Sequence, residues 1–507
     1  MSDRDRLLRR RRLPAALVAH AAVACMTGLL LGYDLCIAGT ILTPVQRTLH
    51  LCFPCANGTS DAALATCTCM EKQLAISAVS VGAMFGALTG GHAADVFGRR
   101  AALFASDILF AAGGLAMAMA MPHSAWLFFS GRAVVGLALG IGGSASSAYL
   151  AEIAPTAWRG RFLLANELAV CLGCLAAYFV AWLAGDARWR WSIGVTALIA
   201  VLQMLGLLVM HESPTWLASQ GQAERASHAA GMIAGAAATS APAHIVTASS
   251  SICSSSDSCE AIADEATPLP SRTAVTTWQA LGAHRRPLLL AVGVAIAHAA
   301  TAANTVLYYS REVLQLAGVS QPLLVSAAVG LTKTFGVAIA WALADRAGRR
   351  MLLLTGTAMM VMALVAMVVA FLDATRPTSG LAVAALLTFI LGWDVSWAGL
   401  MLTLIAEVLP QRVRGVGTGL AYATFWALSF VTGQFLESAF AALGIAQTFG
   451  LVALLCLAVW LWTWCYVPET ANRSLEQIAR TCGRAETPAA PAAAATTATT
   501  DTVADGK

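Results

Sequence analysis

Long apolar segments recur along the chain and are separated by shorter polar stretches. Each apolar segment is close to the length at which a helix crosses the hydrocarbon core of a bilayer, about 20 residues. The pattern therefore predicts an all-α polytopic membrane protein with about twelve transmembrane helices. We expect these helices at residues 14–42, 74–94, 100–121, 125–150, 162–184, 190–210, 287–309, 322–344, 351–372, 381–405, 415–440 and 446–467.

The polar stretches between the apolar segments repeat. An acidic residue is followed three positions later by Gly-Arg-Arg at Asp95 and again at Asp345, an offset of 345 − 95 = 250 residues. A second motif, A-E-I-A-P around Glu152 and A-E-V-L-P around Glu407, recurs at an offset of 407 − 152 = 255 residues. The two halves are duplicates of one membrane unit. Two parallel repeats with a substrate site between them are typical of a transporter whose halves rock against each other.

Composition and charge agree with a membrane location. Hydrophobic residues make up 58% of the chain and charged residues 11%, whereas soluble domains carry roughly 25% charged residues. The arginines between residues 4 and 12 precede the first apolar segment, which predicts a cytoplasmic N-terminus. An even number of crossings then places the C-terminus and the Gly-Arg-Arg loops on the same side. Because topology explains these arginines, we expect no nucleic-acid partner.

The longest segment on the predicted outer side, residues 43–73, is rich in cysteine. Outside the cytosol, clustered cysteines usually form disulfide bonds, and four of them allow three pairings. A zinc site is the rival interpretation, but no role for a metal on this side suggests itself. Asn57 begins the sequon N-G-T and is a glycosylation candidate. The disulfide candidates are Cys52, Cys55, Cys67 and Cys69.

The same pattern divides the chain into five parts. A cytoplasmic N-terminus (1–13) precedes a first bundle of six helices (14–210). A cytoplasmic linker (211–286) follows, with short helices and a Ser/Ala-rich part that we expect to be disordered. A second bundle of six helices (287–467) leads into a cytoplasmic tail (468–507). The tail has little room for a signalling domain.

These motifs resemble those of the sugar porter family of the major facilitator superfamily, along nearly the whole chain. The matching motifs are G-L-L-L-G-Y-D (28–34), both acidic Gly-Arg-Arg loops, G-R (131–132) with R-G-R (159–161), E-S-P (212–214), P-E-T (468–470) and S-L-E (474–476). Three details are similar to the class III branch of the facilitative glucose transporters: G-R-A-V-V-G (131–136), N-E-L (166–168) and Lys333. The resemblance implies a major facilitator fold of two six-helix bundles.

The resemblance also implies a function. We expect transport of a hexose or related sugar or polyol by alternating access, as a monomer in the lipid bilayer, with no enzymatic activity. No cofactor and no metal is expected, and the chain has no P-loop for ATP. Facilitative uniport is the favoured mode. The alternatives are a proton-coupled symporter, a porter of a cyclitol or organic anion, and a non-transporting nutrient sensor. The plasma membrane is the expected location, with an endosomal membrane as the alternative.

The resemblance further implies a gate built from charged residues of the cytoplasmic loops. Isolated surface ion pairs contribute only about 0–1 kcal/mol, and a network between two bundles contributes more. Topology alone requires the arginines but not the matched acids, which favours the gate. The gate candidates are Asp95, Arg99, Arg100, Glu152, Arg159, Glu212, Asp345, Arg349, Arg350, Glu407, Arg414 and Glu469.

Charges inside the spans cost about 2.5–3.5 kcal/mol each by insertion scales, so they need partners or a water-filled cavity. Asp34 and Arg132 match the acidic and basic residues that proton-coupled sugar porters use. They are therefore candidates for proton coupling, and a static ion pair is the equal alternative. Asp107 matches no functional position of the family, and we treat it as a packing residue.

The substrate site departs from the pattern of the family that the chain resembles. Most members bind sugar hydroxyls with amide side chains, which both donate and accept hydrogen bonds. Here Glu167 and Lys333 carry charge at two such positions and are able to neutralise each other across the bundles. His298 stands at a glutamine position and is either a sugar ligand or a helix-packing residue. The substrate-binding candidates are Glu167, His298, Asn304, Lys333, Asp394 and Trp426.

Overall fold

The computed structural model of the 507-residue chain describes residues 13–51, 69–155, 158–234, 284–316, 318, 322–372, 378–409 and 413–470. The ordered elements in these ranges are helices, and no strand occurs among them. Four of the candidate site residues lie outside these ranges, namely Asn57, Cys52, Cys55 and Cys67, as do the S-L-E motif (474–476) and the arginines between residues 4 and 12. The side chains of Arg159, Asp345 and Arg414 are likewise outside the described part.

Each predicted span of the first half is a helix. These helices are α2 (Ala15–Leu49), α4 (Met70–Phe97), α5 (Arg99–Ala118), α6 (Ala125–Ile153), α7 (Arg159–Ala184) and α8 (Trp189–Val209). Two short helices follow, α9 (Pro214–Ser219) and α10 (Ala223–Ala234). Ser213 caps α9 by accepting a hydrogen bond from the backbone N–H of Trp216, with Pro214 in the first turn, as expected for an N-terminus of this composition.

The spans of the second half are also helical, but two of them are irregular. The helices are α12 (Arg285–Ala300), α13 (Ala303–Tyr308), α14 (Ser310–Leu316), α15 (Pro322–Ala347), α16 (Arg349–Ala370), α17 (Ser379–Trp393), the π-helical turn η4 (Asp394–Ala398), α18 (Gly399–Val408), α19 (Arg414–Leu443) and α20 (Ile445–Tyr466). The span predicted at 287–309 breaks at Ala302, where φ is 53°. The span predicted at 381–405 is interrupted by η4.

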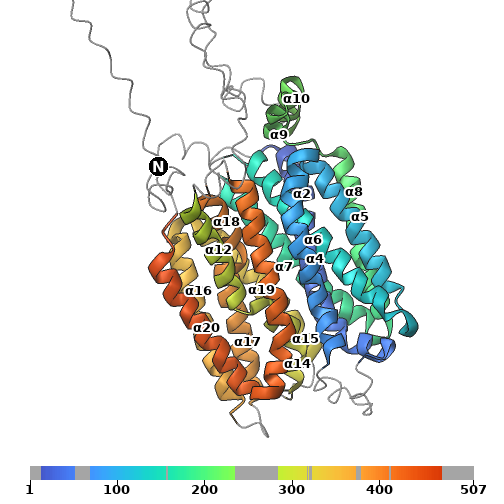
Figure 1. Cartoon of the computed structure of the whole chain (residues 1–507), viewed down its shortest axis with the longest axis vertical. Coiled ribbons are helices and arrows are strands. Elements are labelled where there is room, and N and C mark those ends of the chain that lie inside the picture. The colour runs from blue at the N-terminus through green and yellow to red at the C-terminus, as the bar shows by residue number, and fades with distance from the viewer. Residues whose placement is uncertain are drawn as a thin grey trace, which may run out of the picture.

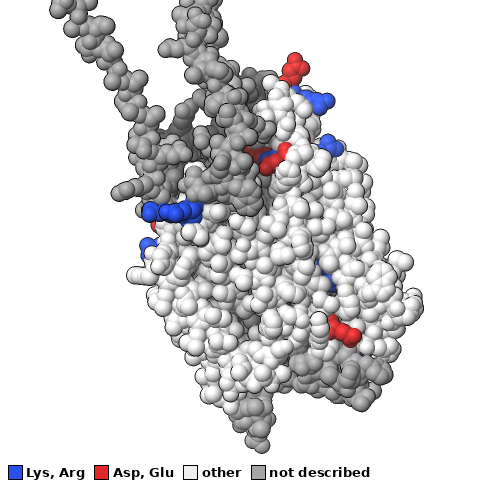
Figure 2. All heavy atoms as spheres, viewed as in Figure 1, with Lys and Arg blue, Asp and Glu red and all other residues white. Residues whose placement is uncertain are grey.

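Eleven helices in the described part of the chain are long and apolar enough to cross a membrane. The remaining predicted span is α19, which has 30 residues and carries polar side chains such as Ser429 and Gln434. The visible surface between the two ends of the molecule is almost without charge (Figure 2). Large apolar side chains are exposed, for example Phe179 at 58% and Leu454 at 66%. Such a surface suits lipid rather than water.

The helices form two bundles side by side, one from each half of the chain (Figure 1). Within the first, α2 packs on α7, and α6 packs on α4 and α5; within the second, α16 packs on α17 and α20. Small residues allow close packing: a Cβ built on Gly136 of α6 would lie 2.0 Å from the carbonyl oxygen of Val79 on α4. Such small-residue contacts replace the hydrophobic driving force that is missing within a bilayer.

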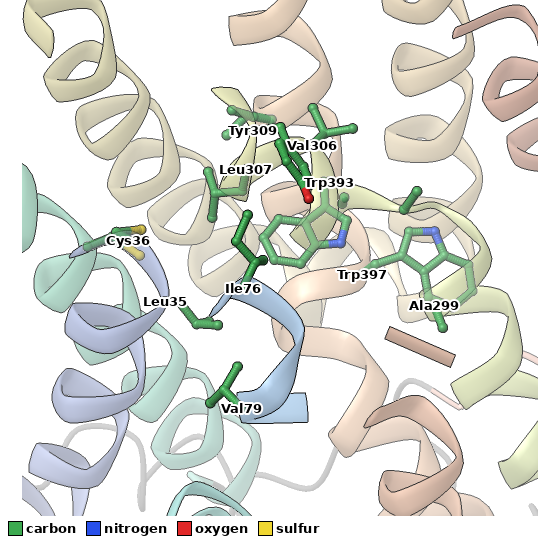
Figure 3. Close-up of a cluster of buried hydrophobic side chains, with 14 of the residues drawn as sticks. Leu35, Cys36, Ile76, Val79, Ala299, Val306, Leu307, Tyr309, Trp393 and Trp397 are labelled. Carbon is green, nitrogen blue, oxygen red and sulfur yellow. The ribbon is translucent and has the colours of Figure 1, made fainter. Parts of the chain in front are cut away.

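The two bundles meet along two helix pairs, α4 with α19 and α7 with α15. Apolar side chains from both halves, among them Leu35, Ile76, Leu307 and Trp393, gather in one buried cluster (Figure 3). The boundary between the bundles is therefore lined with buried apolar side chains. Any charge placed there without a partner is costly.

Candidate functional site

The Gly-Arg-Arg sequence has a structural reason at the start of α5. Gly98 has a φ of 97°, which glycine adopts without steric cost. A Cβ built there would lie 2.5 Å from Oε2 of Glu212. The Glu212 carboxylate accepts hydrogen bonds from the backbone N–H groups of Arg99 and Arg100, at 3.1 Å and 3.1 Å. Glu212 therefore binds as an anion at a helix N-terminus.

The second half repeats this geometry at the start of α16. Gly348 has a φ of 90°, and a Cβ built there would lie 2.4 Å from Oε2 of Glu469. The backbone N–H groups of Arg349 and Arg350 donate to the Glu469 carboxylate at 3.0 Å and 3.2 Å. The duplication seen in the sequence thus extends to the contacts of the two acids.

The arginine side chains of these loops pair with acids of their own half. Nη2 of Arg99 lies 2.8 Å from Oε1 of Glu152 and 3.1 Å from Oδ1 of Asp95. In the second half, Nη2 of Arg349 lies 3.6 Å from Oε1 of Glu407. These described ion pairs join helices within one bundle. Links between the bundles through the other predicted gate residues stay a prediction.

At this end of the molecule the bundles touch through the start of α7. The guanidinium of Arg161 lies 5.2 Å from the ring centroid of Trp341 on α15 and 4.9 Å from that of Trp158. A Cβ built on Gly160 would lie 3.6 Å from Nη2 of Arg349. The cavity between these groups measures about 10 Å³, roughly the space for one water molecule. The two halves are therefore in contact here.

Asp34 and Arg132 form an ion pair inside the first bundle. Nη1 of Arg132 donates to Oδ2 of Asp34 at 2.7 Å, and both side chains are buried. The same guanidinium donates to the carbonyl oxygens of Ala75 at 3.1 Å and Ile76 at 3.4 Å. Three helices of one bundle, α2, α4 and α6, therefore hold this arginine. Oδ1 of Asp34 has no hydrogen-bond partner among the described residues.

Lys333 and Asp394 form a second buried pair, inside the second bundle. Nζ of Lys333 on α15 donates to Oδ1 of Asp394 at 2.9 Å, and both side chains are almost completely buried. The ammonium group also lies 4.2 Å from the ring centroid of Trp393, within the range of a cation–π interaction. The π turn places Trp393 and Asp394 next to each other at the end of α17.

Glu167 of α7 lies at the boundary with the second bundle. Its Cγ is 3.7 Å from the position of a Cβ built on Gly399, at the start of α18. Among the described residues it forms no ion pair within 4.0 Å, and the described partner of Lys333 is Asp394. The direct pairing of Glu167 with Lys333 that the sequence allows is therefore not formed in this conformation. Lys333 and Asp394 still act on Glu167 electrostatically.

His298, in the last turn of α12, is enclosed by side chains of the second bundle. Nε1 of Trp393 donates to Nε2 of His298 at 3.1 Å, and Nδ1 lies 2.7 Å from Sδ of Met401. Phe425 stacks on the imidazole at a centroid distance of 4.8 Å, and Trp397 lies 6.1 Å away. Both ring nitrogens face protein groups. These contacts favour the packing interpretation of His298 over direct contact with a sugar.

The two remaining substrate-binding candidates come from helices on either side of this cluster. Asn304 is half-buried in the first turn of α13, just after the break at Ala302. Trp426 of α19 is 2% exposed and lies 5.8 Å from the ring of Tyr422. Its indole N–H is a hydrogen-bond donor buried beside Tyr422.

At the opposite end, polar side chains of α4 and α19 join the two bundles. Nε2 of Gln73 donates to Oγ of Ser438 at 2.8 Å, and Oγ of Ser77 donates to Oε1 of Gln434 at 2.8 Å. Nε2 of Gln434 donates back to Oε1 of Gln73 at 3.1 Å. The bundles therefore touch at both ends. No motif or charge pattern singles out these four residues.

Three histidines meet beside the predicted gate residue Glu212. His20 of α2 and His211, which precedes α9, lie 3.2 Å apart between Nε2 and Nδ1. The ring of His228 on α10 lies 6.2 Å from that of His211. Burial first, and then the charges of His20, His228 and Arg100, lowers the pKa of His211 from its ordinary value of 6.5. No group of three potential metal ligands is arranged for a metal ion within the described ranges.

Comparison with known proteins identifies the family to which the chain belongs. A family model described as "Sugar (and other) transporter" matches residues 20–481. The chain belongs to this family. It is 30% identical over 411 residues to the putative metabolite transport protein YwtG of Bacillus subtilis, covering 80% of this chain and 85% of that protein. It is 29% identical over 432 residues to the solute carrier family 2 facilitated glucose transporter member 2 of Gallus gallus, covering 83% and 77%.

The fold of this transporter matches a solved structure. The proton:xylose symporter XylE bound to 6-bromo-6-deoxy-D-glucose superposes with a TM-score of 0.72 at 22% identity, over 92% of this chain and 99% of that one. The predicted family and the all-α major facilitator fold are confirmed. The protein is a multi-pass integral membrane transporter and not an enzyme.

Sequence reasoning missed most of the surroundings of His298. Trp393, Trp397 and Met401 are spaced four residues apart, so they recur along one side of a helix and all lie near the imidazole. That spacing was a readable signal. Phe425 gave no such signal, because it comes from α19 and its approach depends on how the helices pack.

Proposed function

We propose that this transporter carries a hexose, or a related sugar or polyol, by alternating access. The observation that carries the proposal is a pair of repeated bundles that touch at both ends, with buried charged side chains in each bundle and Glu167 at the boundary between them. Relatives named as transporters of glucose and xylose support a sugar as the substrate. Uptake of labelled hexoses, pentoses and inositol into proteoliposomes tests it. Uptake that an organic anion inhibits and no sugar inhibits would contradict it.

Two polar atoms support the placement of the substrate near this boundary. Oδ2 of Asp394 is buried without a hydrogen-bond partner among the described residues, and the indole N–H of Trp426 is buried beside Tyr422. One accepts and the other donates, and sugar hydroxyls do both. Glu167 and Asn304 supply further polar groups from α7 and α13. Lys333 contributes its charge through Asp394, and His298 contributes through Trp393.

The favoured mode is facilitative uniport. Arg132 is held by Asp34 and by two carbonyl groups of α4, all within the first bundle. A pair fixed inside one rigid bundle keeps its geometry when the bundles rock, so the transport cycle does not release the acid. Proton symport is the second candidate, because Oδ1 of Asp34 has no described partner and is open to a proton. Uptake against a sugar gradient under an imposed pH gradient separates the two.

The proposal also assigns the two ends of the molecule to the two sides of the membrane. The cytoplasmic gate comprises the acids and arginines of the duplicated loops, and both chain termini face the cytoplasm. The plasma membrane is the proposed location, and one chain forms the functional unit in the bilayer. Disulfide bonds and a glycan on Asn57 belong to the outer segment.

A further inference from the structure

We infer that His298 is a positioning residue: it orients Trp393, and through Trp393 the Lys333–Asp394 ion pair, rather than contacting the transported sugar. The inference rests on the proposed function, because it concerns the site at which the sugar is bound. It assigns to His298 a role in substrate affinity without direct contact.

The hydrogen bonds of His298 define its protonation. Trp393 donates to Nε2 at 3.1 Å, so Nε2 must be the acceptor, and a neutral imidazole then carries its proton on Nδ1. Nδ1 faces Sδ of Met401 at 2.7 Å. With Phe425 stacked on the ring and only 6% of the residue exposed, no free nitrogen remains for a sugar hydroxyl.

Trp393 connects this imidazole to the ion pair. Its indole N–H is used by His298, while the face of the same ring lies 4.2 Å from Nζ of Lys333. A rotation of the indole about its side-chain bonds would break the first contact and move the face away from the ammonium. The hydrogen bond from the Trp393 indole N–H to His298 therefore also holds the ring face that contacts the Lys333 ammonium. Lys333 in turn donates to Asp394, whose second oxygen is unpaired in the described structure.

The location of His298 adds a second reason. It lies one turn before Ala302, a non-glycine residue with a φ of 53°, where α12 ends and α13 begins. Trp393 immediately precedes the π turn. Irregular backbone inside a membrane persists only where surrounding contacts stabilise it, and π turns often accompany functional sites. The His298–Trp393 bond joins these two irregular segments.

The test uses the full-length transporter in proteoliposomes. His298→Ala removes the acceptor, and Trp393→Phe removes the N–H but keeps an aromatic face. Trp460→Phe is the matched control, because its indole also donates within the second bundle, to the carbonyl of Leu354 at 3.0 Å, but is not a described neighbour of the pair. KM and kcat for sugar exchange are measured for each variant, and for His298→Ala in a Lys333→Met/Asp394→Asn background.

We expect His298→Ala and Trp393→Phe each to raise KM about tenfold, in the range of a weakened cation–π contact, with kcat nearly unchanged. The double variant should be no worse than either single one, since both act on the same contact. In the background without the ion pair, His298→Ala should leave KM unchanged. Trp460→Phe should behave as wild type. If His298→Ala raised KM by the same factor in every background, the result would indicate direct sugar contact and overturn the inference.

A second measurement does not depend on sugar. Lys333 is buried, so acetic anhydride should label it slowly in the wild type, as read by peptide mass spectrometry. Labelling should rise about tenfold in His298→Ala and Trp393→Phe and stay slow in Trp460→Phe. Unchanged labelling in both test variants would contradict the positioning role. If the wild type carries no sugar, the proposed function fails, and the labelling result still decides this inference.

Discussion

Replacing Gly98 with alanine should open the proposed cytoplasmic gate. A Cβ at this position would stand 2.5 Å from Oε2 of Glu212, closer than real Cβ contacts allow. The obstructing atom is the end of a flexible side chain, so Glu212 will move away rather than distort the backbone. Its carboxylate then loses the N–H donors of Arg99 and Arg100 at the start of α5.

The free-energy cost of Gly98→Ala has two parts. Alanine at a φ of 97° costs about 1–2 kcal/mol of backbone strain. Hydrogen bonds to a charged group contribute about 1.5–3 kcal/mol each. Because Glu212 is partly exposed, its two hydrogen bonds together contribute roughly as much as one such bond. Gly221→Ala separates the parts, since Gly221 has a φ of 75° with nothing within 4 Å of a built Cβ. The difference between the variants, about 1.5–3 kcal/mol, sets the upper limit of the shift in the gate equilibrium at roughly 10- to 100-fold, reached when the Glu212 contact is made only in the closed state.

The assay is the rate at which a membrane-impermeant thiol reagent, added on the gate side, modifies a cysteine placed at Thr403. Thr403 lines the small cavity between the bundles beside Arg161, so it becomes accessible only when they separate. We expect faster modification in Gly98→Ala and in its counterpart Gly348→Ala, and no change in Gly221→Ala. Equal rates in Gly98→Ala and Gly221→Ala would refute the role of the Glu212 contact.

Three further outcomes are expected. Lys333→Met or Asp394→Asn alone should destabilise the protein by about 3–5 kcal/mol, because each leaves a buried charge unpaired. The double variant of Lys333 and Asp394 should recover most of the lost melting temperature. The losses of stability from Glu167→Gln and Lys333→Met should instead be closer to additive. Under an imposed proton gradient, uptake by the wild type should stop when the sugar concentrations inside and outside the vesicles are equal, and Asp34→Asn should retain sugar exchange. Uptake by the wild type against the sugar gradient that is lost in Asp34→Asn would instead show symport. Because the pKa of folded His211 is lowered from 6.5, the docking of α10 on α2 should be fully stable above pH 6.5 and weaken as the pH falls below it. Hydrogen-exchange protection factors in α10, which are corrected for the intrinsic exchange rate, should therefore be lower at pH 6 than at pH 7.5; His211→Gln should remove this dependence, and the control His123→Gln should not.

The spans and the duplicated loops could be predicted because their causes are local. An apolar run of the length of a bilayer must be helical to satisfy its backbone, and Gly-Arg-Arg with a distant matched acid repeats as a pattern of letters. The start of α9 followed in the same way from Ser213 and Pro214. These features depend on residue type and spacing alone.

The irregular segments could not be predicted, because no local residue requires them. Ala302 is neither glycine nor proline, yet it takes a left-handed conformation amid contacts from other helices. The partner of Lys333 is a similar case. Two acids were available, and the choice depends on how α15 meets the π turn, where a Cβ built on Gly336 would lie 2.7 Å from Cβ of Asp394. That approach brings Asp394, and not Glu167, to the ammonium.

The placement of the charges bears on how the transporter moves. Asp34 with Arg132, and Lys333 with Asp394, are each neutralised inside a single bundle, so a rocking motion of the bundles need not separate either pair. Glu167 differs, because it belongs to the first bundle and faces the second near Gly399, with no ion pair of its own among the described residues. Separation of the bundles would take it away from Lys333 and Asp394 together. Of the charges at the centre, Glu167 is therefore the one whose surroundings change most between the two open states, and a sugar bound beside it would sense that change directly.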